Sequence, residues 1–109
     1  MTYEEIVDHV RHMYENADAR SIFEHIAIQV NIVGEGAGAF YVEVAERHIC
    51  VEPYDYRDRD GLITAQADDL MELAMRKITF DEAIASGKIQ YVGNVDKIKK
   101  LANVKFKKK

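Results

Sequence analysis

Residues 26–44 decide the fold, and they read IAIQVNIVGEGAGAFYVEV. Isoleucine or valine occupies every second position from Ile26 to Ile32, with alanine or a polar residue between, and this period of two predicts a half-buried strand. Three glycines at positions 34–38 predict a turn, and apolar residues at every second position from Phe40 to Val44 predict a second strand. The stretch therefore predicts a β-hairpin with one apolar face.

The same kind of pattern continues on both sides of the hairpin. Ile49 and Val51 predict a third strand, which Pro53 ends. Residues 62–67 and 88–92 predict two more strands. Apolar residues at helical spacing predict one helix before the hairpin and three after residue 67, with helix-capping residues at the starts listed here: Thr2, Asp68, Thr79 and Asn94. The predicted order is α-βββ-β-αα-β-α, and because amphipathic helices must cover the apolar face of an antiparallel meander, the fold class is α+β.

Composition and charge are those of one globular domain. The chain has 109 residues, of which 48% are hydrophobic and 31% charged, with a net charge of −4. Seven lysines and no acid occupy residues 97–109, leaving eight basic and 19 acidic residues before them. An acidic body disfavours nucleic acid as a partner. We expect one domain over residues 1–102 and a lysine-rich tail over 103–109.

Targeting signals and cysteine chemistry indicate a cytoplasmic protein. The first 20 residues carry charges within the first turns, unlike a signal peptide, and the longest uncharged run is too short to span a bilayer. Cys50 is the single cysteine and has no partner for an internal disulfide, which is typical of a reducing compartment.

Metal sites are weakly indicated. The loop at residues 58–61 resembles part of a calcium loop but lacks its first and last ligands. His48, Cys50 and Glu52 share one face of the third strand, but an exposed sheet face with incidental polar residues is the plainer interpretation. His9 and His12 lie three residues apart on the first helix, where surface helix pairs are the plainer interpretation. We expect no metal and no cofactor.

Catalytic groups are equally sparse. Neither serine lies in a nucleophile motif, and Cys50 has no assigned base. Asp55 with Tyr54 or Tyr56 would form an acid-base pair for an enzyme acting on an apolar substrate, provided that burial raises the carboxyl pKa. Arg57 beside this pair indicates solvent instead, so we expect no enzyme activity.

Apolar residues on the later helices allow two interpretations. Met71 and Met75, followed by Phe80 and Ile84, lie on helices expected to face the sheet. Methionine adapts to irregular shapes and suits a lipid pocket, while the same stripe is common in an ordinary core. On the residues alone, both interpretations stay open.

A series of short motifs runs through the C-terminal half: ITAQADDL at 63–70, KITFDEA at 77–83 and GKIQYVGN at 87–94, followed by residues 97–101. In order and spacing these motifs resemble the sterol carrier protein-2 domain family, and the upstream segments 38–44 and 52–55 fit the family's order. The likeness spans residues 24–102. It departs from the family at Arg76, which precedes Lys77 where the family usually has glycine, and at the lysine tail, which replaces a peroxisomal address.

The resemblance implies a five-stranded, mixed and largely antiparallel sheet with helices covering one face. It also implies an apolar tunnel between sheet and helices that takes a fatty acid, acyl-CoA or sterol-like lipid without catalysing a reaction. The expected apolar lining comprises Val30, Phe40, Val42, Ile49, Val51, Leu70, Met71, Met75, Phe80, Ile84, Ile89 and Leu101. The lysine-rich tail suits transient contact with an anionic membrane, although a solubilising tail or a regulatory interaction module would share these features.

Overall fold

The hairpin predicted from residues 26–44 forms the centre of a five-stranded sheet. The structure is a computed structural model that describes residues 2–15, 17–18 and 22–106. The strands of this sheet are β2 (Ile26–Val33), β3 (Gly38–Ala45), β4 (His48–Glu52), β5 (Gly61–Gln66) and β6 (Ile89–Gly93). Their order across the sheet is β4-β3-β2-β5-β6. The α+β class and the five-stranded sheet are therefore confirmed.

One parallel pair makes this sheet mixed. β2 pairs antiparallel with β3, β3 with β4, and β5 with β6, whereas β2 and β5 run parallel. Val30 on β2 is paired with Phe40 on one side and with Ile63 on the other. These side chains share one face because neighbouring residues in register point to the same side of a sheet. The apolar alternation seen in the sequence becomes a continuous buried surface.

Four helices follow the predicted order, and three of the four predicted caps form. They are α1 (Tyr3–Glu15), α2 (Ala67–Ala74), α3 (Phe80–Ala85) and α4 (Val95–Ala102). Thr79 forms a reciprocal capping box with Glu82, and the Asn94 side chain accepts a hydrogen bond from the Lys97 amide. Thr2 and Glu5 make the same reciprocal bonds at the start of α1. The prediction for Asp68 was wrong: α2 begins at Ala67 and its N-cap is Gln66, so Asp68 lies inside the first turn.

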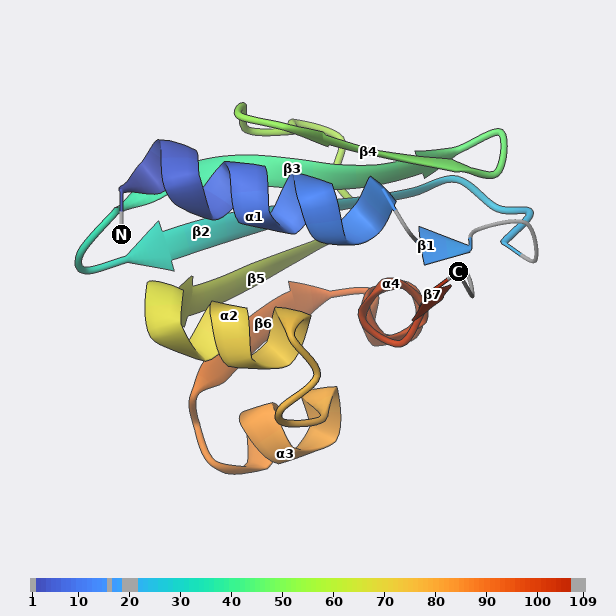
Figure 1. Cartoon of the computed structure of the whole chain (residues 1–109). Helices are drawn as coiled ribbons and strands as arrows, with labels where there is room; N and C mark the ends of the chain where they lie inside the picture. The colour runs from blue at the N-terminus through green and yellow to red at the C-terminus, as the bar shows by residue number, and fades with distance from the viewer. Residues whose placement is uncertain (1, 16, 19–21, 107–109) are drawn as a thin grey trace.

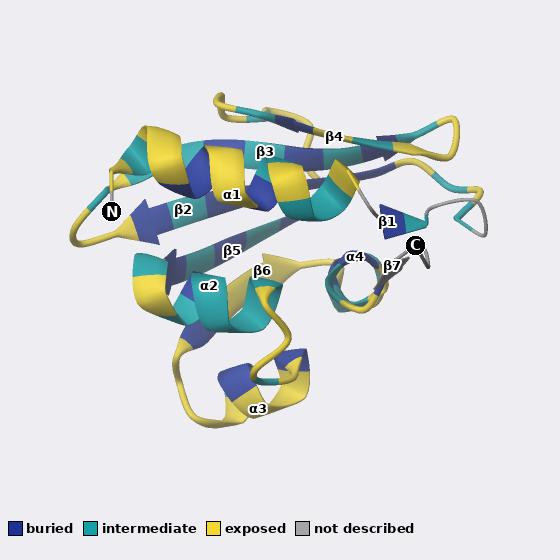
Figure 2. Cartoon of the chain, viewed as in Figure 1, coloured by how far each residue is buried: buried dark blue, intermediate teal, exposed yellow. Residues whose placement is uncertain are grey.

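The helices lie over one face of the sheet, as Figure 1 shows. α1 contacts β4, α2 lies beside β5, and α4 contacts β2 and β5. α3 lies apart from this layer and contacts α2 and β6. In Figure 2 the buried residues of α1 and α2 face the sheet. The outer surface of α1 is largely exposed, whereas that of α2 is mostly of intermediate exposure.

Two short strands join the ends of the chain, and the sequence did not predict them. β1 (Ala17–Asp18) follows α1 and pairs antiparallel with β7 (Lys105–Phe106). Val104, just before β7, has only 5% of its surface exposed. The folded part therefore continues to Phe106, past the predicted boundary at residue 102. Among the described residues, no helix is long and apolar enough to cross a membrane.

Candidate ligand pocket

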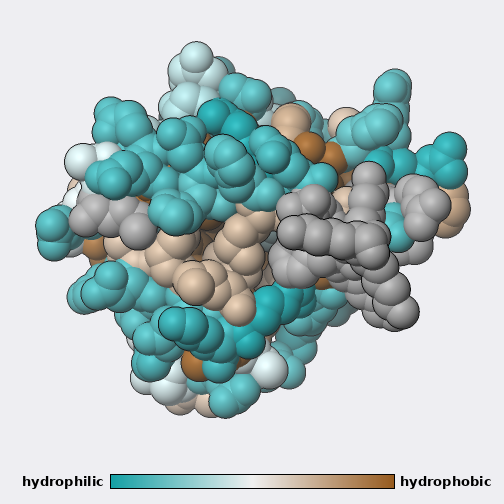
Figure 3. Space-filling model, in the orientation of Figure 1, coloured by the Kyte–Doolittle hydropathy of each residue, from teal (hydrophilic) through white to brown (hydrophobic). Residues whose placement is uncertain are grey.

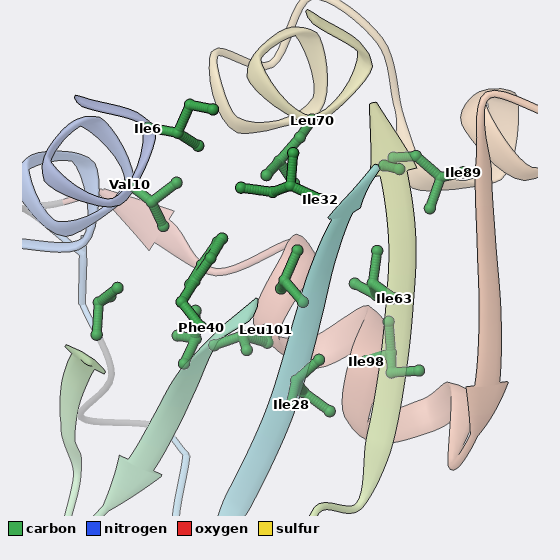
Figure 4. Close-up of a cluster of buried hydrophobic side chains, with 14 of the residues drawn as sticks. Ile6, Val10, Ile28, Ile32, Phe40, Ile63, Leu70, Ile89, Ile98 and Leu101 are labelled. Atoms are coloured by element: carbon green, nitrogen blue, oxygen red, sulfur yellow. The ribbon is translucent and has the colours of Figure 1, made fainter. Parts of the chain in front are cut away.

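A cavity lies between the sheet and helices α1, α2 and α4. Figure 4 shows Val10, Leu70 and Leu101 reaching from these three helices toward Phe40 and Ile28 on the sheet. The lining consists of Val10, Met13, Tyr14, Ile28, Val30, Phe40, Val42, Ile63, Leu70, Leu73, Ala74, Arg76, Ile98, Leu101 and Ala102. All but Tyr14 and Arg76 are apolar. The cavity therefore presents hydrocarbon on nearly every side.

The cavity is small and partly open to solvent. The centre of a water molecule can occupy about 60 Å³, whereas the full space between the lining atoms and across the mouth is about 630 Å³. The smaller volume is the better measure of the free space, because the larger volume includes open solvent. In Figure 3 a strip of apolar surface lies between the polar outer faces of α1 and α2, the helices that supply Met13 and Ala74.

The predicted lining residues divide into three groups. Those at the cavity are Val30, Phe40, Val42, Leu70 and Leu101. Those in the surrounding core but outside the lining are Val51, Phe80 and Ile89, which are buried, and Ile49, Met71 and Ile84, which are partly buried against it. Met75 has 56% of its surface exposed and joins neither group. α3 packs beside β6, which explains why its residues Phe80 and Ile84 stay away from the cavity.

Sequence reasoning missed the contribution of α1 and, apart from Leu101, that of α4. Val10, Met13 and Tyr14 line the cavity from α1, and Ile98 and Ala102 line it from α4. The signal was present, because Val10 and Met13 belong to the apolar stripe that predicted the first helix. That stripe shows which side of the helix is buried, but it does not show whether the buried side meets other atoms or a void.

Tyr14 is one of the two polar side chains at the cavity. Its hydroxyl donates a hydrogen bond of 3.2 Å to the Leu101 carbonyl oxygen and so ties α1 to α4. Burial raises the pKa of this hydroxyl to about 12, which is only partly offset by the positive charge of Arg76. Tyr14 is therefore a neutral group at physiological pH, with its proton engaged by the protein backbone.

Arg76 is the other polar group, and it stands at the end of α2 in an unusual backbone conformation. The Arg76 amide donates to the Leu73 carbonyl at 3.1 Å, and the Lys77 amide donates to the Glu72 carbonyl at 2.9 Å. This pair of bonds is a Schellman motif, which places its first residue after the cap in the left-handed region and favours glycine there. Arg76 occupies that position with a φ of 62°. The departure from glycine noted in the sequence therefore changes the side chain but not the turn.

The Arg76 side chain crosses from this turn to the C-terminal segment. Its Nη2 donates to the carbonyl oxygen of Val104, the buried residue before β7. The residue as a whole is exposed, so the guanidinium lies at the rim of the cavity rather than in its interior. The rim thus combines one fixed positive charge with the apolar strip between the helices.

Comparison with known protein families decides what kind of domain this is. The model of the SCP-2 sterol transfer family matches residues 8–105. The chain belongs to the SCP-2 sterol transfer family. Among curated proteins, no sequence matches this chain significantly.

Solved structures with the same fold include other members of the SCP-2 family. Sterol carrier protein 2 like 2 from Aedes aegypti is 21% identical with a TM-score of 0.68, covering 91% of this chain and 92% of that chain. The solution structure of its palmitated form has the same identity and TM-score and covers 94% and 92% of the two chains. The sec-alkylsulfatase Pisa1 from Pseudomonas sp. is 11% identical with a TM-score of 0.77 over 89% of this chain but only 15% of its own. At these identities the likeness establishes the fold.

A polar cluster lies on the sheet face that points away from the helices of this SCP-2 domain. The Glu43 carboxylate is 2.6 Å from His25 Nε2 and accepts a 2.8 Å hydrogen bond from the Tyr56 hydroxyl. These hydrogen bonds, the His25 bond above all, hold the pKa of Glu43 below its usual value. Cys50 Sγ lies 3.8 Å from Glu43, and burial together with this negative charge raises the pKa of the thiol. A raised pKa keeps the thiol protonated, which is the opposite of what a nucleophile needs.

The predicted alternatives for metal and acid-base chemistry find little support at their sites. Within the described part of the chain, no group of three or more His, Cys, Asp or Glu side chains is arranged to hold a metal. Asp60, in the loop that resembled a calcium site, accepts hydrogen bonds from the Ala27 amide at 2.8 Å and from Lys97 Nζ at 3.1 Å. Asp55 and Asp58 are exposed and lie outside the cavity lining. The acid-base hypothesis therefore lacks the buried carboxyl that it requires.

Proposed function

We propose that this protein binds a lipid, such as a fatty acid, acyl-CoA or sterol-like molecule, in the cavity and carries it without catalysing a reaction on it. The observation that carries the proposal is the cavity itself, which three helices and three strands line with apolar side chains. Membership of the SCP-2 family supports it, as does the palmitated form of a protein with the same fold. No catalytic group is needed, because burying each methylene of an alkyl chain contributes about 0.8 kcal/mol.

A lipid requires the cavity to widen beyond its present free volume of about 60 Å³. The side chains best placed to move are those at the mouth, where Met13 and Leu73 are only partly buried. Methionine has three rotatable bonds and a polarisable sulfur, so its rearrangement costs little. The inner lining, with Phe40 fully buried on β3, is fixed by the sheet and provides the rigid floor. Binding is expected to displace the helices slightly and to leave the sheet unchanged.

The direct test is recovery and uptake of lipid. Protein purified under gentle conditions is examined by native mass spectrometry, extracted with organic solvent, and titrated with a fluorescent fatty acid. We expect bound lipid or saturable uptake at one site per chain. Complete absence of both would refute the proposed function.

A matched pair of variants assigns uptake to this cavity. Ala74 ends α2 at the cavity, and Ala85 ends α3 at an exposed position outside the lining. Ala74→Phe places a ring in the mouth and is expected to reduce uptake at least tenfold, whereas Ala85→Phe leaves uptake unchanged. If the two variants behave alike while both remain folded, the ligand binds elsewhere.

The same proposal includes transient contact of the lysine-rich tail with an anionic membrane. The α4 lysines are engaged within the fold: Lys97 pairs with Asp60, Lys99 with Asp81 and Lys100 with Glu24. The contact therefore depends on the lysines of the tail, namely Lys105 and the last three, residues 107–109. The last three lie outside the described residues. Replacing these three with glutamine is expected to reduce sedimentation with phosphatidylserine vesicles at low salt, and unchanged sedimentation would refute this part. Deleting residues 103–109 is a poorer test because it also removes buried Val104 and β7.

A further inference from the structure

We propose that two copies of this chain associate through β6, whose strands pair antiparallel and join the two five-stranded sheets into one continuous sheet. The inference does not depend on the lipid, because none of the described residues that line the cavity belongs to β6. It begins from a difference between β4 and β6, the two edge strands of the sheet.

The two edges of the sheet are protected differently. At β4, Arg11 of α1 donates hydrogen bonds from Nε and Nη2 to the Val51 carbonyl oxygen, at 3.2 and 3.0 Å. A side chain bonded to the backbone of an edge strand hinders the addition of a further strand. At the other edge, within the described part of the chain, β5 is the one strand paired with β6, and the sequence of β6, IQYVG, contains neither a charged residue nor proline. β6 therefore lacks the charges and the proline that commonly prevent an edge strand from pairing with another chain.

β6 also exposes apolar side chains on both faces of the sheet. Its last four residues are exposed (Figure 2), with 69% of the surface of Val92 and 38% of that of Tyr91 accessible. Val92 is in register with Leu62 of β5 and shares with it the sheet face that points away from the helices. Tyr91 points to the opposite face, where its ring centroid lies 6.0 Å from that of Phe80. A strand added beside β6 would cover apolar side chains on each face.

Charges at the two ends of β6 favour a second copy of the chain as the added strand. Lys88 comes directly before the strand, and Asp96 comes three residues after its last residue, Gly93. In an antiparallel pair of β6 strands, the start of one lies beside the end of the other, so each Lys88 is brought toward Asp96 of the second copy. The Lys88 Nζ is 3.2 Å from Glu72 of α2, and Asp96 lies in the first turn of α4, so both side chains are on the helix side of the sheet. A parallel pair would place like charges together instead.

Twofold symmetry closes this assembly at two copies. An axis through the middle of β6 passes near Tyr91, so the two tyrosines lie opposite one another, and cross-strand aromatic pairs stabilise antiparallel sheets. Both copies use the same surface, as in most small oligomers, and no β6 edge is left for a third copy. The remaining edges of the joined sheet are the two β4 strands, where Arg11 is bound.

Sedimentation velocity over a range of concentrations tests the association. A single strand pair makes a small interface, so we expect the mass to rise from 12.5 kDa toward twice that value between about 10 μM and about 1 mM. Val92→Lys places two like charges close to the axis and is expected to weaken dimerisation about tenfold. Val33→Lys is the matched control, because Val33 is 44% exposed on the same face of the sheet but lies at the end of the central strand β2. Both substitutions change exposed side chains, and circular dichroism checks that both proteins fold.

Exchanging the end charges tests the antiparallel arrangement. Lys88→Glu and Asp96→Lys each bring like charges together across the interface and are expected to weaken dimerisation several-fold, whereas the double variant restores it. The internal pair of Lys88 with Glu72 is lost in the single and the double variant alike, so it does not explain a recovery. In the wild-type protein, the amides of β6 should exchange with deuterium more slowly at the higher concentration, and this measurement needs no variant.

Each outcome decides the inference. A wild-type chain that keeps a mass of 12.5 kDa over the whole concentration range overturns it. It is also wrong if Val92→Lys leaves dimerisation unchanged, or if Val33→Lys weakens dimerisation equally, because the copies would then meet through another surface. A double charge variant as weak as the two single ones excludes the antiparallel pairing. None of these results bears on lipid uptake, which is measured separately.

Discussion

Tyr3 and Gly38 fix the beginning of α1 over the sheet, and exchanging Gly38 for alanine tests this contact. A Cβ added at Gly38 would lie 2.5 Å from Cε1 of Tyr3, well inside the contact distance of two carbon atoms. The Tyr3 hydroxyl also donates a hydrogen bond to the Ala39 carbonyl. The backbone of Gly38 does not have a positive φ, so alanine itself is free of strain there. The nearest obstacle to alanine is therefore the tyrosine ring.

The magnitude follows from these contacts. Tyr3 is only partly buried, so its ring can turn away, but it then loses one hydrogen bond worth about 0.5–1.5 kcal/mol and a contact area worth about 1 kcal/mol. Alanine in place of glycine returns about 0.4–1 kcal/mol by restricting the unfolded chain. Gly38→Ala is thus expected to lower the free energy of unfolding by about 1 kcal/mol. In a Tyr3→Ala background the obstacle is gone, and the same change should raise stability by about 0.4–1 kcal/mol.

The assay is urea unfolding of the four proteins in this double-mutant cycle, followed by far-ultraviolet circular dichroism. The change of sign corresponds to a coupling free energy of about 1.5–2 kcal/mol, several times the deviation expected between independent sites, about 0.3–0.5 kcal/mol. The m-values should agree among the four proteins, since a change in m would indicate an altered denatured state. If the two single changes simply add, Tyr3 does not rest on Gly38 and this account of α1 is wrong.

Two further predictions concern a titration and a glycine. Because the pKa of Tyr14 is raised to about 12 from 10.0, the folded state holds this proton more tightly, and its stabilising contribution is complete below pH 10 and is lost as pH rises toward 12. Tyr14→Phe should therefore lower the free energy of unfolding by about 1 kcal/mol at pH 7 through the lost bond to Leu101. Between pH 10 and 12, the free energy of unfolding of this variant should fall less steeply with pH than that of wild type. Parallel pH profiles of the two proteins in alkaline unfolding would contradict this. Gly93→Ala should lower the free energy of unfolding by more than about 2 kcal/mol, because φ is 105° and the new Cβ would lie 2.6 Å from the Asp60 carbonyl oxygen. Gly87→Ala, with a φ of 79° and open space around the Cβ, should cost only about 1 kcal/mol in the same urea titration, and equal losses would refute the steric argument.

Caps and strands were predictable because their signals are local. The reciprocal bonds of Thr79 and Glu82 need only residues three apart, and the alternation from Ile26 to Ile32 needs only its own strand. Asp68 shows where local signals become ambiguous: β5 runs directly into α2 at Ala67, so the helix begins one residue before the capping side chain. The β1–β7 pair was missed because it joins two residues at one end of the chain to two at the other, with no pattern in either.

The pocket was predictable in kind but only partly in its residues. Phe40 and Leu70 were found because both lie in segments that resemble the family and on apolar faces, Phe40 by strand alternation and Leu70 by helical spacing. Both lie on elements that meet at the cavity. Met75 continues the apolar helical pattern of Leu70 and Met71 in the sequence. However, α2 ends at Ala74, and the turn that follows leaves Met75 exposed. Arg76 was visible in the sequence only as a departure from glycine.

The sequence by itself determined the order of the four helices and of the five strands of the main sheet, their apolar faces, and, through its resemblance to known domains, the family. These properties depend on periodicity and on contacts between residues a few positions apart, and both can be recognised directly in the sequence. Only the tertiary structure decided which apolar side chains surround a void and which pack solidly, because that depends on how α1, α2 and α4 are spaced over the sheet. It also placed the Arg76 charge at the rim of that void, since the direction of a side chain after a helix is set by the turn and by the distant segment it contacts.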